Sequence, residues 1–227
     1  MIELLSWDTD FFGYSVGKIE VQDKDFLPSF DSHFRLIYVF SKNKIDELEH
    51  SLVDRKATFV CSIKQFSEVN RKMQIEPFDP VRHDYNELIG LTLESGVYSR
   101  FFVDENFVNG EYEKLYTRWI DNSITGLFPF TVYVAIANGK LVGFITLSNK
   151  EGLADIGLLA VSKEARGKGV ATELITYVKN IAYENGLNTM QVVTQLDNSP
   201  AIKLYESQGF ILNELVYIYH IWNHDTI

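Results

Sequence analysis

Several features that would restrict the class of this 227-residue chain are scarce or missing. It contains one cysteine, Cys61, so it cannot close a disulfide within the chain. Cys61 lies in the apolar run 58–63, where a buried thiol is the commoner interpretation and a reactive thiol the alternative. No apolar run approaches the length of a membrane span, and the N-terminus lacks the basic-then-apolar pattern of a secretory signal. We therefore expect a cytoplasmic protein with no membrane partner.

Positive charge is scarce as well. With 31 acidic and 21 basic residues the formal net charge is −10, which argues against a nucleic-acid partner. The five histidines show no metal-ligand spacing, so we expect no metal site. An anionic ligand would therefore need a local cluster of positive groups.

The first 72 residues have the pattern of a small α/β unit. Strand-like runs lie at 15–21, 35–40 and 58–63, with a helix expected near 44–56. Helices are expected next at 77–95 and 112–124. We place a domain boundary near residue 72, which divides the chain into a small N-terminal domain, 1–72, and a larger domain, 73–227.

The C-terminal half has the strongest strand pattern. Asn138-Gly139 supplies the positive φ values of a tight hairpin turn. Gly186 stands where a long amphipathic helix would end. We expect the order β-β-β-α-β-α-β, with strands at 131–137, 141–147, 153–161, 189–195 and 210–222 and helices at 168–185 and 199–209.

Two glycines precede the long helix, in the stretch Arg166-Gly167-Lys168-Gly169. A helix N-terminus carries free N–H groups and partial positive charge, and glycines let an anion approach the main chain. Arg166 and Lys168 add formal charge. A pair of glycines alone is weak evidence for a ligand loop.

The longer stretch is more specific. Residues 158–161 followed by 166–171 resemble motif A of the GCN5-related N-acetyltransferases, whose pattern is Arg/Gln-x-x-Gly-x-Gly/Ala. Residues 198–201 with 204–206 and 209–210 resemble motif B of the same superfamily. The resemblance implies the GNAT fold, an α/β fold with a mixed central sheet, splayed strands and flanking helices, here preceded by the small α/β N-terminal domain.

The resemblance also implies acetyl-CoA as cofactor. Main-chain groups at Leu159 and Val161 would pair with the pantetheine arm, the loop and helix start would hold the pyrophosphate, and Asn198 would contact the cofactor arm. The implied cofactor-binding residues are Leu159, Val161, Arg166, Gly167, Lys168, Gly169, Val170, Ala171, Asn198 and Ala201.

Tyr205 matches the tyrosine that protonates the departing thiolate in this superfamily. A phenol with a reference pKa near ~10 can pass its proton to a thiolate with a reference pKa near ~8.5. The alternative is an aromatic residue on the buried face of an amphipathic helix, and both interpretations direct the ring inward.

The group that deprotonates the amine is less defined. Asp155 lies six residues before Val161, where some histone acetyltransferases of the superfamily carry a glutamate base, but it also fits an ordinary polar strand residue. Glu94 and Asp104 are alternatives. An amine with a pKa near ~8 is partly neutral at pH 7 and needs no strong base.

Segments that precede motifs A and B indicate which substrate accepts the acetyl group. Residues 96–101 and 115–123, with 7–9 and 11–13 near the N-terminus, resemble bacterial TDP-fucosamine acetyltransferases. Those enzymes acetylate the 4-amino group of dTDP-4-amino-4,6-dideoxygalactose, a precursor of surface polysaccharides. The resemblance therefore implies an amino-sugar nucleotide as substrate.

Arg100 is the first candidate to bind the diphosphate of such a substrate, because a guanidinium binds phosphate oxygens in bidentate fashion. Tyr98 and Phe101 would offer a face to the thymine or the sugar. Alternatively, Arg100 pairs with Asp104 or Glu94 and the aromatic residues belong to the core.

The sequence thus predicts an N-acetyltransferase in which the amine attacks acetyl-CoA directly, with no acyl-enzyme, and main-chain N–H groups stabilise the oxyanion. The alternatives are a peptide or protein N-acetyltransferase of the same superfamily and a non-catalytic acyl-CoA-binding regulator. A homodimer through the apolar run 215–222 is a further expectation.

Overall fold

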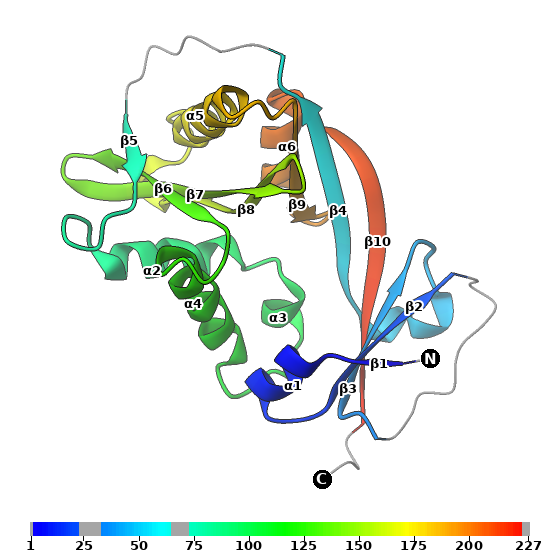
Figure 1. The fold of residues 1–227 in the computed structure, drawn as a ribbon. Coiled ribbons are helices and arrows are strands. Elements are labelled where there is room, and N and C mark those ends of the chain that lie inside the picture. Colours follow the sequence, from blue (N-terminus) through cyan, green and yellow to red (C-terminus); the bar gives the residue numbers. More distant parts are fainter. Residues whose placement is uncertain (1, 23–32, 65–72, 224–227) are drawn as a thin grey trace.

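The computed structural model describes residues 2–22, 33–64 and 73–223. Within these ranges the chain forms a mixed sheet flanked by helices (Figure 1), so the predicted α/β class is confirmed. The strands are β1 (Glu3–Leu4), β2 (Val16–Val21), β3 (Leu36–Ser41), β4 (Leu52–Ser62), β5 (Gln74–Pro77), β6 (Thr131–Ala137), β7 (Lys140–Lys150), β8 (Leu153–Val161), β9 (Thr189–Gln195) and β10 (Ile211–Trp222). The helices are α1 (Ser6–Phe12), α2 (Tyr85–Ser95), α3 (Arg100–Val103), α4 (Glu111–Ile124), α5 (Val170–Glu184) and α6 (Ser199–Ser207), with 3-10 turns η1 (Asp46–Ser51) and η2 (Lys163–Ala165).

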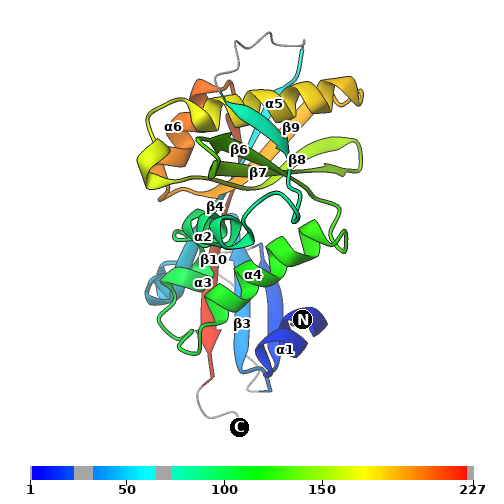
Figure 2. The ribbon, with the colours of Figure 1, turned by 90° about the vertical axis from the view of Figure 1, so that its left-hand side faces the viewer.

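The described strands form one ten-stranded sheet in the order β1-β2-β3-β10-β4-β9-β8-β7-β6-β5. The β2–β3 and β8–β9 pairs are parallel and the others are antiparallel. Figure 1 shows β4 and β10 as long strands that run from the half of the molecule with α5 and α6 to the half with α1, and Figure 2 shows the same two halves from the side. The sheet is therefore shared by both halves.

The position of β4 bears on the predicted domains. The boundary near residue 72 lies outside the described residues, and the division into 1–72 and 73–227 stays a prediction. However, β4 from the first segment is hydrogen-bonded to β9 and β10 of the second. The two segments thus share a continuous layer of main-chain hydrogen bonds.

The position of β10 bears on the expected dimer. β10 pairs with β3 on one side and β4 on the other, so residues 215–222 offer no free strand edge to a second copy. The homodimer through this run stays a prediction.

Two predicted helices differ from the observed elements. The helix expected at 44–56 is a 3-10 turn, η1, and β4 begins at Leu52. Charged residues at 54–56 imitate the polar face of a helix, but here they lie on a strand. The helix expected at 77–95 begins at Tyr85, because the Asp84 side chain accepts hydrogen bonds from the amides of Asn86 and Glu87 and caps it there.

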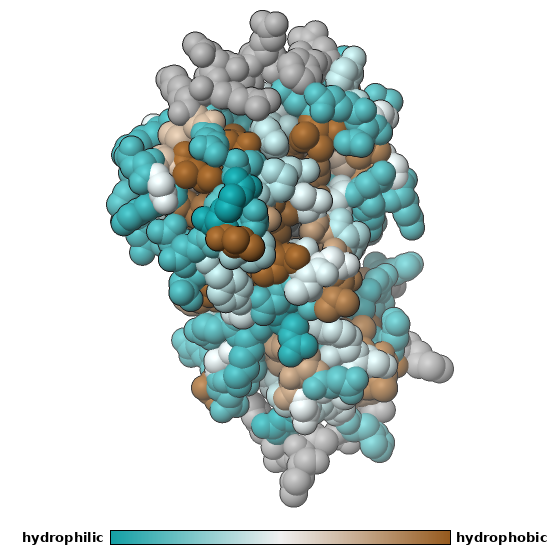
Figure 3. Space-filling model, turned by 60° about the vertical axis from the view of Figure 1, so that its left-hand side comes forward, coloured by the Kyte–Doolittle hydropathy of each residue, from teal (hydrophilic) through white to brown (hydrophobic). Residues whose placement is uncertain are grey.

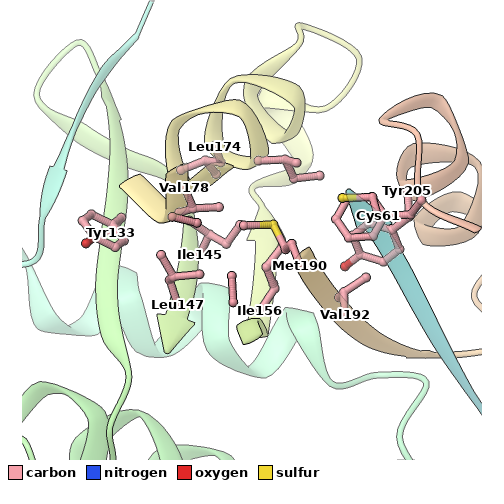
Figure 4. Packing of buried hydrophobic residues seen from close by; sticks show 14 of the residues in the cluster. Cys61, Tyr133, Ile145, Leu147, Ile156, Leu174, Val178, Met190, Val192 and Tyr205 are labelled. Atoms are coloured by element: carbon pink, nitrogen blue, oxygen red, sulfur yellow. The ribbon is translucent and has the colours of Figure 1, made fainter. Parts of the chain in front are cut away.

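The core between the sheet and α5 holds the C-terminal half together. Leu174 and Val178 of α5 pack on Ile145 and Met190 of the sheet, all fully buried (Figure 4). Cys61 belongs to the same cluster and is 5% exposed, so the prediction of a buried thiol is confirmed. On the opposite face, α2 and α4 pack on β6 and β7.

A buried polar network joins β10 to the loop after α3. The Nδ1 atom of His220 lies 2.6 Å from Asp104 Oδ2, and Trp222 Nε1 donates to the same oxygen at 2.9 Å. Burial lowers the pKa of His220 to about 4, so the ring is neutral and donates through Nδ1. Burial opposes ionisation of Asp104, but the hydrogen bonds from His220, Trp222 and Asn106 outweigh it and lower its pKa to about 2.

The outer surface carries both polar and apolar side chains. Figure 3 shows patches of apolar side chains on one face, among largely hydrophilic side chains. Among the described residues, each helix is too short or too polar to span a lipid bilayer.

The buried His220 predicts acid sensitivity of the fold. The unfolded chain binds a proton at His220 near pH 6.5, whereas the folded chain does so only near pH 4. The free energy of unfolding should therefore fall as the pH is lowered from 6.5 to 4, by up to ~1.4 kcal/mol per pH unit from this residue. Urea unfolding of the parent and His220→Gln across this range measures the difference, because glutamine can donate to Asp104 without titrating.

His50→Gln is the matched control, since His50 is exposed on η1. The same fall with pH in the parent and in His220→Gln would contradict the assignment.

Candidate active site

The site is built around the divergence of β8 and β9. Their pairing ends at Ile156 with Val192, although β8 continues to Val161 and β9 to Gln195. Beyond this point the main-chain groups of β8 that face β9 have no strand partner. The splayed strands expected from the resemblance are present.

A bulge in β8 lies where the strands diverge. The register between β7 and β8 shifts there, so that Gly157 and Leu158 stand opposite Thr146, and the Leu158 amide donates to Thr146 Oγ1 at 2.8 Å. A Cβ atom on Gly157 would lie 2.8 Å from Thr146 Oγ1 and 2.8 Å from the Phe130 ring. Glycine at this position lets the strand bend away from its neighbour.

A cleft of ≈ 600 Å³ lies between the splayed strands, β4, α3, α4 and α6. The predicted site residues that line it are Leu159, Val161, Arg166, Ala171, Asn198, Ala201, Tyr205, Tyr98, Arg100 and Phe101. The predicted residues outside its lining are Asp155, Gly167, Lys168, Gly169 and Val170. The structure therefore brings the cofactor and acceptor candidates together in one cleft.

The glycine loop presents amides at the start of α5. Gly169 is the N-cap residue with φ +86°, and Gly167 has φ +74°, a region that side chains disfavour. The N-cap has no side chain to accept from the first amides of the helix, so these donors are available to a ligand. Val170 contributes its amide alone, because its side chain is buried in the core.

Arg166 is held at the mouth of the cleft. Its Nε atom donates to the Val161 carbonyl at 3.0 Å, and its guanidinium pairs with Glu94 at 2.8 Å. Both Arg166 and Glu94 are partly exposed. A phosphate group could draw the guanidinium from Glu94, because an exposed ion pair of this kind is weak. Lys168 is exposed on the loop itself.

Tyr205 occupies the inner part of the site. It is 5% exposed, and its ring packs on Phe59 and Phe210. In Figure 4 the hydroxyl oxygen points toward Val192, and no hydrogen bond to a described residue is formed by it. Burial raises the pKa of Tyr205 above its ordinary value, so the phenol stays protonated near neutral pH and acts as a donor. The ring is buried and also lines the cleft, and the role of Tyr205 as proton donor stays a prediction.

Asn198 and Ala201 begin α6. The Asn198 side chain accepts a hydrogen bond from the Ala201 amide at 3.2 Å and caps the helix. Asn198 also lines the cleft. Ala201 lines the cleft one turn before Tyr205.

Arg100 lines the cleft and forms no ion pair with another residue in the described ranges. Its Cζ atom stands 4.7 Å from the Tyr38 ring centroid and 4.6 Å from that of Phe101. The partners that the sequence left open are engaged elsewhere, since Glu94 pairs with Arg166 and Asp104 bonds to His220. Arg100 Nε is buried with no hydrogen-bond partner among the described residues.

The two aromatic candidates differ in exposure. Tyr98 is 37% exposed at the cleft, so it can offer a face to a ligand. Phe101 is 6% exposed and packs among Phe12, Phe107 and Trp119. Phe101 is thus a core residue that supports Arg100.

Asp155 lies on β8 just before the strands diverge. Gln191 Nε2 donates to its Oδ1 atom at 2.8 Å. Asp155 does not line the cleft, so its predicted role as base would require a bridging water or a movement.

Sequence reasoning missed Asp54 and Lys56, which line the cleft from β4. They stand two residues apart on the same face of the strand. Burial raises the pKa of Asp54 to about 6, against the opposing effects of Arg100 and Gln195. Burial and the charge of Arg100 lower the pKa of Lys56. Charged residues between apolar strand positions were the available signal, but the helix expected at 44–56 concealed it.

Residues 97–210, about half of the chain, match the family model described as acetyltransferase (GNAT) family. The chain belongs to this family, and it is therefore an enzyme that uses acetyl-CoA. The free amides of α5 and the unpaired edge of β8 fit this cofactor, since they offer donors to a pyrophosphate and a strand edge to an amide-bearing arm. Among the described residues, no group of three or more His, Cys, Asp or Glu side chains is placed to hold a metal ion.

Two relatives have names that concern sugars. The chain is 25% identical over 227 residues to the dTDP-fucosamine acetyltransferase of Escherichia coli, covering 95% of this chain and 96% of that protein. It is 28% identical over 143 residues to the spore coat polysaccharide biosynthesis protein SpsD of Bacillus subtilis, covering 63% of this chain and 49% of that protein. The chain thus spans about half the length of the second relative.

Solved structures share the fold. A functionally unknown conserved protein from Staphylococcus epidermidis superposes with a TM-score of 0.66 at 14% identity, covering 92% of this chain and 84% of that chain. A GCN5-related N-acetyltransferase from Sphaerobacter thermophilus gives a TM-score of 0.54 at 15% identity, with 85% and 62% covered.

Gly169→Ala should weaken coenzyme A binding by about tenfold, because a Cβ atom there strains the loop and crowds the free amides. Gly186→Ala is the matched control. Gly186 ends the same helix with φ +75°, so alanine meets similar backbone strain far from the loop. Calorimetric titration measures the affinity of each variant for coenzyme A. Thermal unfolding tests whether Gly169→Ala and Gly186→Ala lose the same stability. Equal coenzyme A affinities in the two variants would contradict the assignment of this loop to the coenzyme A site.

Proposed function

We propose that this acetyltransferase transfers the acetyl group of acetyl-CoA to the amino group of a nucleotide-linked amino sugar of the dTDP-4-amino-4,6-dideoxyhexose type. The observation that carries the proposal is the Arg100 guanidinium, which lies in the same cleft as Tyr205 and forms no ion pair within the described part of the chain. A sugar nucleotide has a diphosphate, and an acidic protein must meet it with placed cations. Arg100 and Lys56 supply two such cations.

The length of the similarity supports this substrate class. The E. coli relative, which is named for dTDP-fucosamine, matches both the family core and the segment before it. That earlier segment contributes Lys56 and Tyr38, which lie beside Arg100. The acceptor side of the cleft is therefore built partly from residues that the family core lacks.

The residues of the cleft suggest how the reaction is assisted. Acetyl-CoA supplies the acetyl group as an activated thioester. The free main-chain groups of β8 orient the cofactor arm, and N–H groups near the bulge stabilise negative charge on the acetyl oxygen. The Tyr205 phenol donates a proton to the departing sulfur. No side chain needs to form a covalent bond with the acetyl group.

A panel of acceptors tests the substrate class. The enzyme is incubated with acetyl-CoA and either dTDP-4-amino-4,6-dideoxygalactose, dTDP-4-amino-4,6-dideoxyglucose or a peptide with a free N-terminus, and free thiol is measured. We expect the sugar nucleotides to be acetylated and the peptide not. Turnover of the peptide without turnover of either sugar would refute the sugar proposal, and binding of acetyl-CoA with no acceptor turned over by any arm would favour a regulator.

Arg100→Lys, assayed with the same panel of acceptors, tests whether Arg100 binds the acceptor substrate and not the cofactor. Lysine keeps the charge but loses the planar contact with Tyr38, so KM for the sugar nucleotide should rise while KM for acetyl-CoA stays constant. Arg118→Lys, on the exposed face of α4, is the control.

Tyr205→Phe tests the proton donor. Removing the hydroxyl should lower kcat by about 100-fold or more, while coenzyme A binding stays intact because the ring still packs on Phe59 and Phe210. Steady-state kinetics and calorimetry give the two quantities. An unchanged kcat would exclude Tyr205 from the mechanism.

A further inference from the structure

Asp54 lines the cleft and has a carboxylate oxygen without a hydrogen-bond partner among the described residues. The residue is 7% exposed, it lines the same cleft as Tyr205 and Leu159, and its Oδ1 atom is buried with no hydrogen-bond partner among the described residues. A buried acceptor without a donor is costly, which makes a ligand donor at this point the natural partner. The side chain of Gln195, at the end of β9, favours the ionised form of the carboxyl group and opposes the effect of burial on its pKa.

The Arg100 guanidinium, which acts on Asp54, also has a nitrogen without a hydrogen-bond partner among the described residues. Arg100 affects the Asp54 carboxyl electrostatically, but the two described side chains form no ion pair, and Arg100 Nε lacks a partner too. Both residues line the cleft. An occupant that donates to Asp54 and accepts from Arg100 would satisfy both, and an amine next to an oxygen on a sugar ring has this pattern.

The other carboxylates near the cleft are already engaged. Glu94 pairs with Arg166, Asp104 accepts from His220 and Trp222, and Asp155 accepts from Gln191. Asp54 differs from them in that it forms no ion pair with a described residue and has a buried oxygen to which no described group donates.

We propose that Asp54 is the proton acceptor for the attacking amine. The amine nitrogen bonds to the acetyl carbon, the carbon–sulfur bond breaks, and the proton lost by nitrogen goes to Asp54. The departing sulfur takes a proton from Tyr205, and transfer of the Asp54 proton through solvent to the tyrosinate restores both groups. This assignment rests on acetyl transfer itself and holds for any amine acceptor.

The environment of Asp54 suits this role. Burial raises its pKa to about 6, so the group is largely ionised at pH 7 yet close enough to neutrality to take a proton. The charged and polar groups that act on it come from several elements, namely Lys56 on β4, Gln195 and Asp197 at the end of β9, Arg100 on α3 and Tyr116 on α4.

The test compares Asp54→Asn and Asp54→Glu with the parent. Asp46→Asn is the control, because Asp46 is an exposed carboxylate on the preceding turn. The acceptor is dTDP-4-amino-4,6-dideoxygalactose, or the peptide if the parent enzyme accepts that instead, so that failure of the sugar proposal leaves this test intact. The measurements are kcat/KM for the acceptor between pH 5 and 9, coenzyme A affinity by calorimetry, and the thermal unfolding midpoint.

We expect Asp54→Asn to lower kcat/KM by about 100-fold or more at pH 7 and to lose the fall of kcat/KM that the parent shows below about pH 6. Coenzyme A affinity should be unchanged, and the unfolding midpoint at pH 7.5 should not fall, because a buried charge is removed. Asp54→Glu should regain part of the activity, and Asp46→Asn should match the parent.

Two results would overturn the proposal. One is an Asp54→Asn enzyme within about threefold of the parent that keeps the same fall below pH 6. The other is a loss of turnover matched by equal losses of coenzyme A affinity and unfolding midpoint, which would indicate a structural role.

Discussion

The structure depends on the point at which β8 and β9 stop pairing. Main-chain groups in a sheet normally satisfy each other, and leaving a strand edge open inside a protein costs free energy unless another group fills it. Here the bulge at Gly157 and Leu158 turns β8 away after Ile156, and the core beneath α5 keeps both strands in place. The chain thus maintains an open edge that a ligand with its own amide groups can complete.

The elements around the cleft place functional side chains and amides beside this open edge of β8. The glycine loop places the N-terminus of α5 at one end of β8, α6 presents Tyr205 beside β9, and α3 places Arg100 over the aromatic side chains of Tyr38 and Phe101. The segment before residue 72 takes part through β4, which brings Asp54 and Lys56 to the cleft. The family match at 97–210 therefore covers the cofactor side better than the acceptor side.

The parts that could be predicted from sequence are those with local signals. Asn138-Gly139 predicted the hairpin between β6 and β7, and both residues have the positive φ values that such a turn requires. The loop before α5 has a fixed spacing of glycines and charges, so its place was also predictable. Asp54 was missed, because the charged run Asp54-Arg55-Lys56 resembles the polar end of a helix more than it resembles part of a strand. Its burial arises from α3, α4 and β9, which are distant in sequence.

The placement of β10 has a consequence for the order in which the sheet assembles. β10 follows every other described element in the chain, yet it lies between β3 and β4 and pairs with both. Until residues 211–222 have been synthesised, β3 and β4 each have an exposed strand edge. Such long-range pairing slows folding and leaves edges open to other chains. The half of the sheet that carries α1 therefore becomes complete only after residues 211–222 have been synthesised.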